Sequence, residues 1–126
     1  MKDQQLGKVL IVEDEPLILN IAQDEFEDAG YEVIVATDGQ SAIEALERHP
    51  DVRLLFTDIR MPGQPDGWDL AHRARQMLPD LTVIYATGFS GGEPRPVEGS
   101  LLFMKPYRLA TIIEAARSLD GPRRHS

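Results

Sequence analysis

Short apolar runs and longer amphipathic stretches alternate along this chain. Five apolar runs of four to six residues are each followed by polar or turn-forming residues. Runs of this length that are rich in β-branched side chains are typical of strands buried on both faces. The runs that we expect to be strands are 8–12, 31–36, 52–57, 81–86 and 101–104.

Between these runs, apolar residues recur at helical spacing. The first helical stretch has Pro16 in its first turn and is closed by Gly30, positions that suit these two residues. The other helical stripes are 42–46, 68–78 and 112–119. Strands that alternate with helices predict a doubly wound α/β domain, a five-stranded parallel sheet with helices on both faces.

The stretch between the last two expected strands departs from this alternation. Only 17 residues separate Thr87 from Lys105, and they include four glycines and two prolines. Relative to alanine, a glycine costs a helix about 1 kcal/mol and a proline about 3 kcal/mol. We therefore expect the fourth helix to be short or mobile.

Length and composition predict one soluble globular domain. The chain has 126 residues, 42% of them hydrophobic and 27% charged, which suits a single domain over 1–126. We expect a core at about 8–119 and flexible tails at 1–7 and 120–126. The longest apolar runs are far shorter than the roughly 20 residues that cross a bilayer. Residues 1–7 lack the apolar stretch of a secretory signal and the chain has no cysteine, so we expect a cytoplasmic protein without membrane contact.

The charge balance argues against nucleic acid as a direct partner. Thirteen basic and 21 acidic residues give a net charge of −8. Most of the surface should therefore repel phosphate backbones. The acids could serve solubility alone, or some of them could gather at a cation site.

Polar residues collect where the expected strands end. Glu13 and Asp14 follow the first strand, Asp58 the third, Thr87 the fourth and Lys105 the fifth. In doubly wound sheets, ligands bind beyond the carboxyl ends of the strands. Three carboxylates at one rim repel one another unless a cation lies among them. Oxygen ligands with net negative charge suit Mg²⁺.

A phosphoryl group would explain the lysine and the hydroxyl. Its oxygens need charge compensation and hydrogen-bond donors, which Lys105, Thr87 and a metal ion can supply. A carboxylate can act as the nucleophile in phosphoryl transfer. Asp58 is the best placed of the acids for that role.

Four motifs in chain order resemble those of the CheY-like receiver family of two-component response regulators. They are VLIVEDE, LLFTDIRMPG, YATG and FMKPY, within a resemblance that runs from about Lys8 to Leu119. The resemblance implies a flavodoxin/CheY-like (βα)5 fold. It also implies that Asp58 and Asp14 bind Mg²⁺ directly, that Glu13 acts through water, and that the backbone carbonyl of Arg60 completes the protein ligands.

The resemblance further implies a phosphorelay switch. A histidine kinase or histidine phosphotransfer protein would phosphorylate Asp58, and the change would alter binding of a downstream protein target. Such a domain is not an enzyme in the usual sense, since it catalyses only its own phosphorylation and slow dephosphorylation. We expect a monomer or a phosphorylation-dependent dimer.

The chain departs from the commonest receivers in three places. Leu102 stands where many receivers carry a switching aromatic residue, whose role could be absent or moved to Phe103 or Tyr107. The Ala-Thr-Gly pattern around Thr87, with the glycine-rich stretch after it and one extra residue in the turn after Asp58, resembles alphaproteobacterial receivers that stand alone or accompany hybrid kinases. At the position of Arg60, the family tunes dephosphorylation.

Ordinary structural roles also fit several residues. Asp66 is expected to cap a helix, Trp68 to pack, and His49, His72 and His125 to have no catalytic or metal role.

Three other functions compete with this one. A haloacid-dehalogenase-like phosphatase would need an acid where Arg60 stands. In a flavodoxin-like FMN module, Glu13 and Asp14 would repel the cofactor's phosphate. A pseudo-receiver that only binds partners stays open, and Mg²⁺-dependent phosphorylation distinguishes it.

Overall fold

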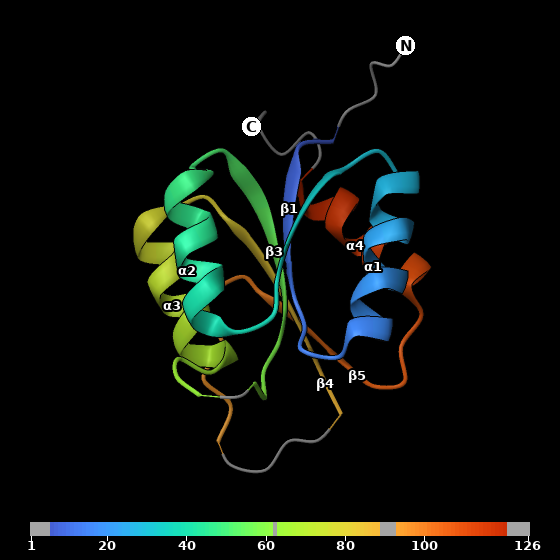
Figure 1. The fold of residues 1–126 in the computed structure, drawn as a ribbon. Coiled ribbons are helices and arrows are strands. Elements are labelled where there is room, and N and C mark those ends of the chain that lie inside the picture. The colour runs from blue at the N-terminus through green and yellow to red at the C-terminus, as the bar shows by residue number, and fades with distance from the viewer. Residues whose placement is uncertain (1–5, 62, 89–92, 121–126) are drawn as a thin grey trace.

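The computed structural model describes residues 6–61, 63–88 and 93–120 (Figure 1). One five-stranded sheet forms its centre, in the order β2-β1-β3-β4-β5, and every neighbouring pair is parallel. The strands are β1 (Lys8–Val12), β2 (Glu32–Ala36), β3 (Val52–Asp58), β4 (Thr82–Thr87) and β5 (Leu101–Met104). The predicted doubly wound parallel sheet is confirmed.

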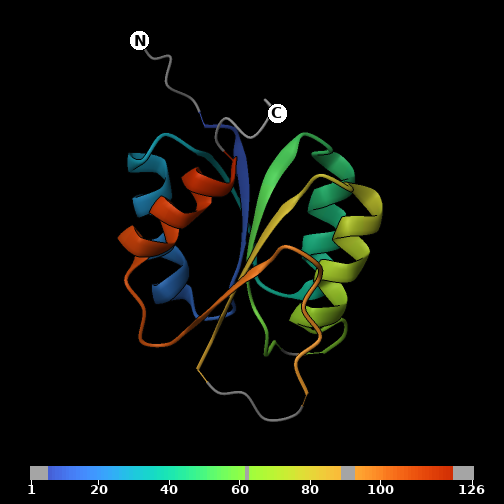
Figure 2. The same ribbon diagram turned by 180° about the vertical axis from the view of Figure 1, so that it is seen from behind.

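Helices cover both faces of this sheet. They are α1 (Pro16–Asp28), α2 (Gly39–Arg48), α3 (Gly67–Met77) and α4 (Leu109–Asp120). Figures 1 and 2 show α2 and α3 on one face and α1 and α4 on the other. Within the described part of the chain, no helix is both long and apolar enough to cross a membrane.

The sheet separates two hydrophobic cores. Leu10 and Leu55 lie in the core beneath α2 and α3, whereas their chain neighbours Ile11 and Phe56 lie in the core beneath α1 and α4. Successive strand residues point to opposite faces, so a continuous apolar run supplies both cores. The rings of Phe26 and Phe56 pack with their centroids 5.6 Å apart, joining α1 to the sheet.

The stretch between β4 and β5 contains no helix at residues 93–100. The short or mobile helix expected between β4 and β5 would also include residues 89–92, which lie outside the described residues. Val97 is instead buried in the core beneath α2 and α3. On the edge strand β5, the side chains of Leu102 and Met104 are exposed, at 43% and 50%.

The described part of the chain begins next to β1 and ends with α4. The N–H of Leu6 donates to the carbonyl of Gly30, and the carbonyl of Gly7 accepts from Glu32. At the other end, α4 continues to Asp120. The remaining tail residues, 1–5 and 121–126, lie outside the described part, so the tails stay a prediction.

Candidate phosphoryl-accepting site

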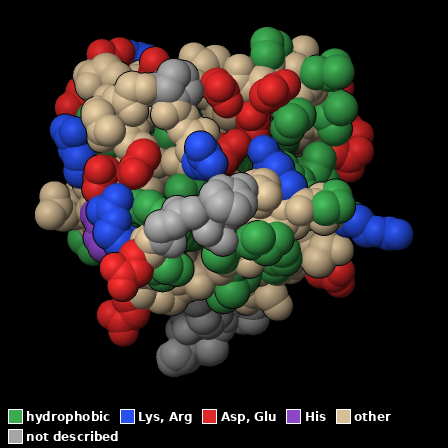
Figure 3. Space-filling model, turned by 90° about the horizontal axis from the view of Figure 1, so that it is seen from below, with side chains coloured by type: hydrophobic (Ala, Val, Ile, Leu, Met, Phe, Trp, Pro, Cys, Tyr) green, Lys and Arg blue, Asp and Glu red, His purple; other side chains and the backbone are tan. Residues whose placement is uncertain are grey.

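The polar residues at the strand ends come together at one rim of the sheet. Glu13 and Asp14 follow β1, Asp58 ends β3, Thr87 ends β4 and Lys105 follows β5. These four strands are consecutive neighbours in the sheet, so parallel pairing brings their carboxyl ends side by side. Figure 3, which shows this end of the molecule, has acidic side chains next to basic ones near the middle of the face.

Three carboxylates form the centre of the site. Glu13, Asp14 and Asp58 each offer one oxygen, and these oxygens all lie within 4.8 Å of one another. Glu13 and Asp58 are buried, at 5% and 9% exposure, while Asp14 is exposed. Carboxylates this close, two of them buried, repel one another strongly unless positive charge lies nearby.

Lys105 supplies part of that charge. Its Nζ donates to Oδ2 of Asp58 at 3.0 Å and lies 3.8 Å from Oε1 of Glu13. Burial acts to lower the pKa of Lys105, but the hydrogen bond and charge of Asp58 and the charge of Glu13 outweigh it and raise that pKa. Burial raises the pKa of Glu13, against the opposing effects of the Glu15 amide and of Lys105. One ammonium group therefore lies against two of the three carboxylates, those of Asp58 and Glu13.

Backbone amides hold two of the carboxylates in place. The N–H of Arg60 donates to Oδ1 of Asp58 at 3.2 Å, and the N–H of Glu15 donates to Oε2 of Glu13 at 3.0 Å. With Lys105 on Oδ2, both oxygens of Asp58 have a donor. The orientation of the Asp58 carboxylate is therefore set by its own loop and by Lys105, the residue after β5.

Glycines bring the loop after Asp58 close to two helices. A Cβ on Gly67 would overlap the backbone of Asp58 and Ile59, and one on Gly39 would overlap the carbonyl oxygen of Pro65. The N–H of Gly67 also donates to the carbonyl of Ile59 at 2.8 Å. The role of these glycines was not predicted from the sequence, although an Asp-Gly pair before a helical stripe is a signal of a tight approach.

Thr87 occupies the end of β4 beside β3, the strand that ends in Asp58. Its exposure is 1%, and its neighbour Ala86 pairs with Asp58 across β3 and β4. The carbonyl of Thr87 accepts from the N–H of Lys105 at 2.7 Å. The hydroxyl-bearing and ammonium-bearing residues are thus joined directly through their backbones.

Phe103 and Tyr107, the two aromatic residues near the switch position, pack against a hydrophobic core. Leu102 is exposed, while Phe103 and Tyr107 pack against the core beneath α1 and α4. The ring of Tyr107 contacts Phe56, with centroids 6.1 Å apart. Residues of β4 that share a face with Thr87, such as Tyr85, belong to the opposite core.

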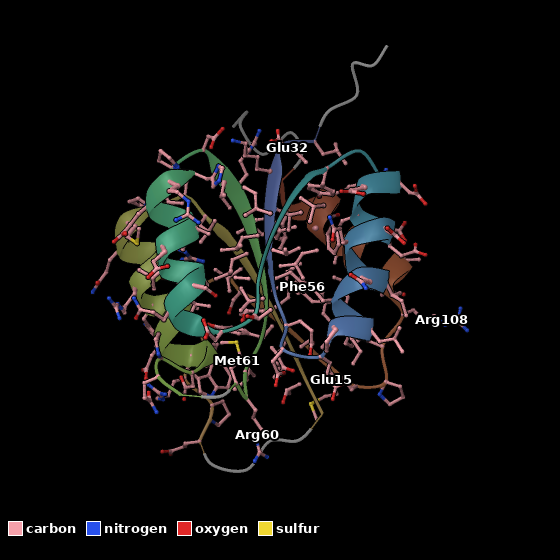
Figure 4. All side chains as sticks on the ribbon, viewed as in Figure 1. Glu15, Glu32, Phe56, Arg60, Met61 and Arg108 are labelled. Atoms are coloured by element: carbon pink, nitrogen blue, oxygen red, sulfur yellow. The ribbon has the colours of Figure 1, made fainter. Side chains whose placement is uncertain are left out.

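The remaining assignments from sequence concern residues around the site. Asp66 caps α3 by accepting from the N–H of Asp69 at 2.9 Å, and Trp68 packs on Tyr85 with centroids 4.7 Å apart, so both predictions are confirmed. His125 lies outside the described residues. Figure 4 shows Arg60 and Met61 on the loop after β3, at the same end of the sheet as Glu15.

The fold and this acidic rim together define the CheY-like class of α/β domains. The family model for the response regulator receiver domain matches residues 9–116, and the chain belongs to that family. Members of the family are signalling switches rather than enzymes in the usual sense.

Relatives place the chain more narrowly. The response regulator receiver protein CpdR of Brucella abortus is 34% identical over 112 residues, which cover 86% of this chain and 92% of that protein. The crystal structure of a response regulator receiver protein from Sinorhizobium medicae matches with a TM-score of 0.86 and 31% identity, over 92% of this chain and 95% of that one. The resemblance to alphaproteobacterial receivers is confirmed.

A receiver from a hybrid kinase is also similar. The crystal structure of the receiver domain of the hybrid histidine kinase CckA matches with a TM-score of 0.78 and 32% identity, over 91% of this chain and 100% of that one. The chain spans 51% of one other curated relative and 33% of another.

Proposed function

We propose that this domain accepts a phosphoryl group on Asp58, in a Mg²⁺-dependent reaction, and that the modified form changes the binding of a downstream protein. The donor would be a phosphohistidine of a histidine kinase or histidine phosphotransfer protein, or a small phosphodonor. The observation that carries the proposal is the buried Asp58 carboxylate, held by Lys105 within a cluster of two further acids. The cytoplasm remains the expected location.

The donor set fits Mg²⁺. Three carboxylate oxygens lie within 4.8 Å of one another, and the exposed position of Asp14 leaves solvent access. Mg²⁺ prefers one or two direct carboxylates and keeps several waters. Asp14 and Asp58 would hold the ion directly with the carbonyl of Arg60, and Glu13 through water. When bound, the ion would neutralise charge on the carboxylates and on the phosphoryl oxygens.

The reaction proposed for Asp58 is a direct displacement. An oxygen of the Asp58 carboxylate forms a bond to phosphorus while the bond from phosphorus to the donor nitrogen or oxygen breaks. The electron pair leaves with the donor, which departs as imidazole after taking up a proton, or as acetate when acetyl phosphate is the donor. Lys105 stays within reach of the new acyl phosphate and compensates its charge.

The switching step requires that the phosphoryl group interact differently with two conformers. Thr87 and Lys105 are the natural differential contacts, since their backbones are hydrogen-bonded to each other beside Asp58. A rearrangement around Thr87 would be passed to the stretch that follows β4. The domain would then work as a monomer or as a dimer formed on phosphorylation.

The test is labelling by acetyl phosphate. With Mg²⁺ present, the wild-type protein should gain one phosphoryl group that is labile to acid, base and hydroxylamine, as an acyl phosphate is, and D58N should gain none. D80N, which changes an exposed aspartate in the turn before β4, is the matched control and should be labelled normally. Labelling of D58N at the wild-type rate would refute the assignment, and a wild type that is never labelled would favour a pseudo-receiver.

A further inference from the structure

An arginine side chain attaches the stretch after β4 to α3. Nη1 of Arg95 donates to Oδ1 of Asp69 at 2.8 Å, and Nη2 lies 3.4 Å from Oδ2 of Asp66. The carbonyl oxygen of Arg95 lies 2.8 Å from Nε2 of His72, which donates when it carries the proton. Three residues of α3 and its cap therefore hold one residue of a segment that forms no helix.

A second attachment lies two residues further on and is buried. The N–H of Val97 donates to the hydroxyl of Tyr85 at 3.1 Å, and Ser100 Oγ donates to the carbonyl of Val97 at 2.6 Å. Val97 is 6% exposed and Tyr85 is 0% exposed. Because Tyr85 lies on β4 two residues before Thr87, this anchor connects the segment to the strand that ends in the site.

Arg95 also contacts the loop on the other side of the acceptor. Asp66 is the last residue before α3, and the loop it ends begins directly after Asp58. The N–H of the adjoining Gly67 donates a hydrogen bond to the carbonyl of Ile59, the residue next to Asp58. Arg95 thus connects the loop that follows the acceptor to the segment that follows Thr87.

We propose that Arg95 is a latch: its contacts with Asp66 and Asp69 hold residues 93–100 in the resting conformation, and phosphorylation acts against them. The proposal rests on the proposed function, because it concerns the cost of switching. The side chains of Arg95 and Asp69 are 48% and 43% exposed. Ion pairs exposed to this degree are individually weak, so the latch can open under the influence of one phosphoryl group.

The experiment compares R95Q with wild type by amide hydrogen exchange and by titration with beryllofluoride and Mg²⁺, a phosphoryl mimic. Without the mimic, exchange at Val97 should become about threefold to tenfold faster in R95Q, because local opening costs less. With the mimic, R95Q should reach half-saturation at a several-fold lower concentration, because less free energy is spent on opening.

Two further variants serve as a second disruption of the ion pair and as a control. D69N removes the other partner of the same ion pair and should reproduce both effects. The double variant R95Q/D69N should show an effect smaller than the sum of the two single-variant effects, because both substitutions break one interaction. R73Q changes a different exposed arginine, one that lies on α3 and takes no part in these contacts, and should behave as wild type. Unchanged Val97 exchange in both R95Q and D69N would overturn the latch.

The two measurements also separate this inference from the proposed function. Faster exchange in R95Q with an unchanged half-saturation would overturn the role of the latch in switching. If the wild-type protein did not bind the mimic at all, the proposed function and the switching role would both fail, while the exchange data would still show whether Arg95 holds the segment.

Discussion

Glu13 is an ionisable side chain with almost no access to solvent. Burial raises its pKa above the ordinary value of 4.5. An acid whose pKa is higher in the folded protein takes up protons on folding, so its ionised form lowers the free energy of unfolding at neutral pH. That cost is complete above the raised pKa and declines as the pH falls from there toward 4.5.

Replacing Glu13 by glutamine should therefore stabilise the metal-free protein at pH 8. The gain in the free energy of unfolding over wild type should shrink as the pH falls through the raised pKa of Glu13. The same substitution should weaken Mg²⁺ binding by about tenfold, the usual effect of losing a partner that orients the metal's ligands. Denaturant unfolding at several pH values, with calorimetric Mg²⁺ titration, measures both; equal stabilities at every pH would contradict the expectation.

Sequence could locate the acids and the lysine because they follow strands. A residue directly after a buried apolar run must lie at the rim where parallel strands end, as Asp58 and Lys105 do. Arg95 could not be found in this way. Its partners Asp66 and Asp69 lie on another element, and nothing in the local pattern around Arg95 indicates which helix it will reach.

At the scale of elements, the start of α3 and the loop after β3 behave as one unit. The backbone of Asp58 and Ile59 lies where a Cβ on Gly67 would have to go. Backbone cannot rotate aside as the end of a flexible side chain can. A side chain at position 67 must therefore displace either the loop after Asp58 or the first turn of α3.

The substitution G67A should consequently lower both stability and labelling. We expect a loss of about 1–3 kcal/mol, as for other overpacked sites, and slower labelling by acetyl phosphate because the Asp58 carboxylate is displaced. G63A is the comparison: Gly63 has a φ of +71° but nothing within 4 Å of an added Cβ, so strain of about 1 kcal/mol is expected, with labelling retained. Normal labelling of G67A would show that the loop adapts freely.

Periodicity predicted most elements closely, and its one gap has a physical cause. The strands β1 and β5 have the expected bounds, since apolar runs end abruptly at polar residues. Residues 93–100 have no such pattern, and they are held in place by tertiary contacts with Tyr85 and α3. Such contacts depend on the finished fold and leave no periodic trace in the sequence.

At the scale of the whole molecule, the net charge of −8 includes a cluster of acids that opposes folding. Mg²⁺ that binds only the folded form should stabilise it by mass action, by about 2.7 kcal/mol at one hundred times its dissociation constant. D14N should lose most of this gain. Thermal unfolding with MgCl₂, against NaCl at equal ionic strength, tests the prediction, and an identical transition in both salts would contradict the metal site.

The strand order also has a consequence for synthesis on the ribosome. Glu13 and Asp58 are synthesised before Lys105, because they lie at the ends of β1 and β3 and Lys105 follows the last strand, β5. Among the described residues, Lys105 is the lysine that pairs with these two acids. A nascent chain that stops before Lys105 has Asp58 without this counter-charge. Competence to receive phosphate should therefore appear late and abruptly during translation, which makes it a marker of a completed domain.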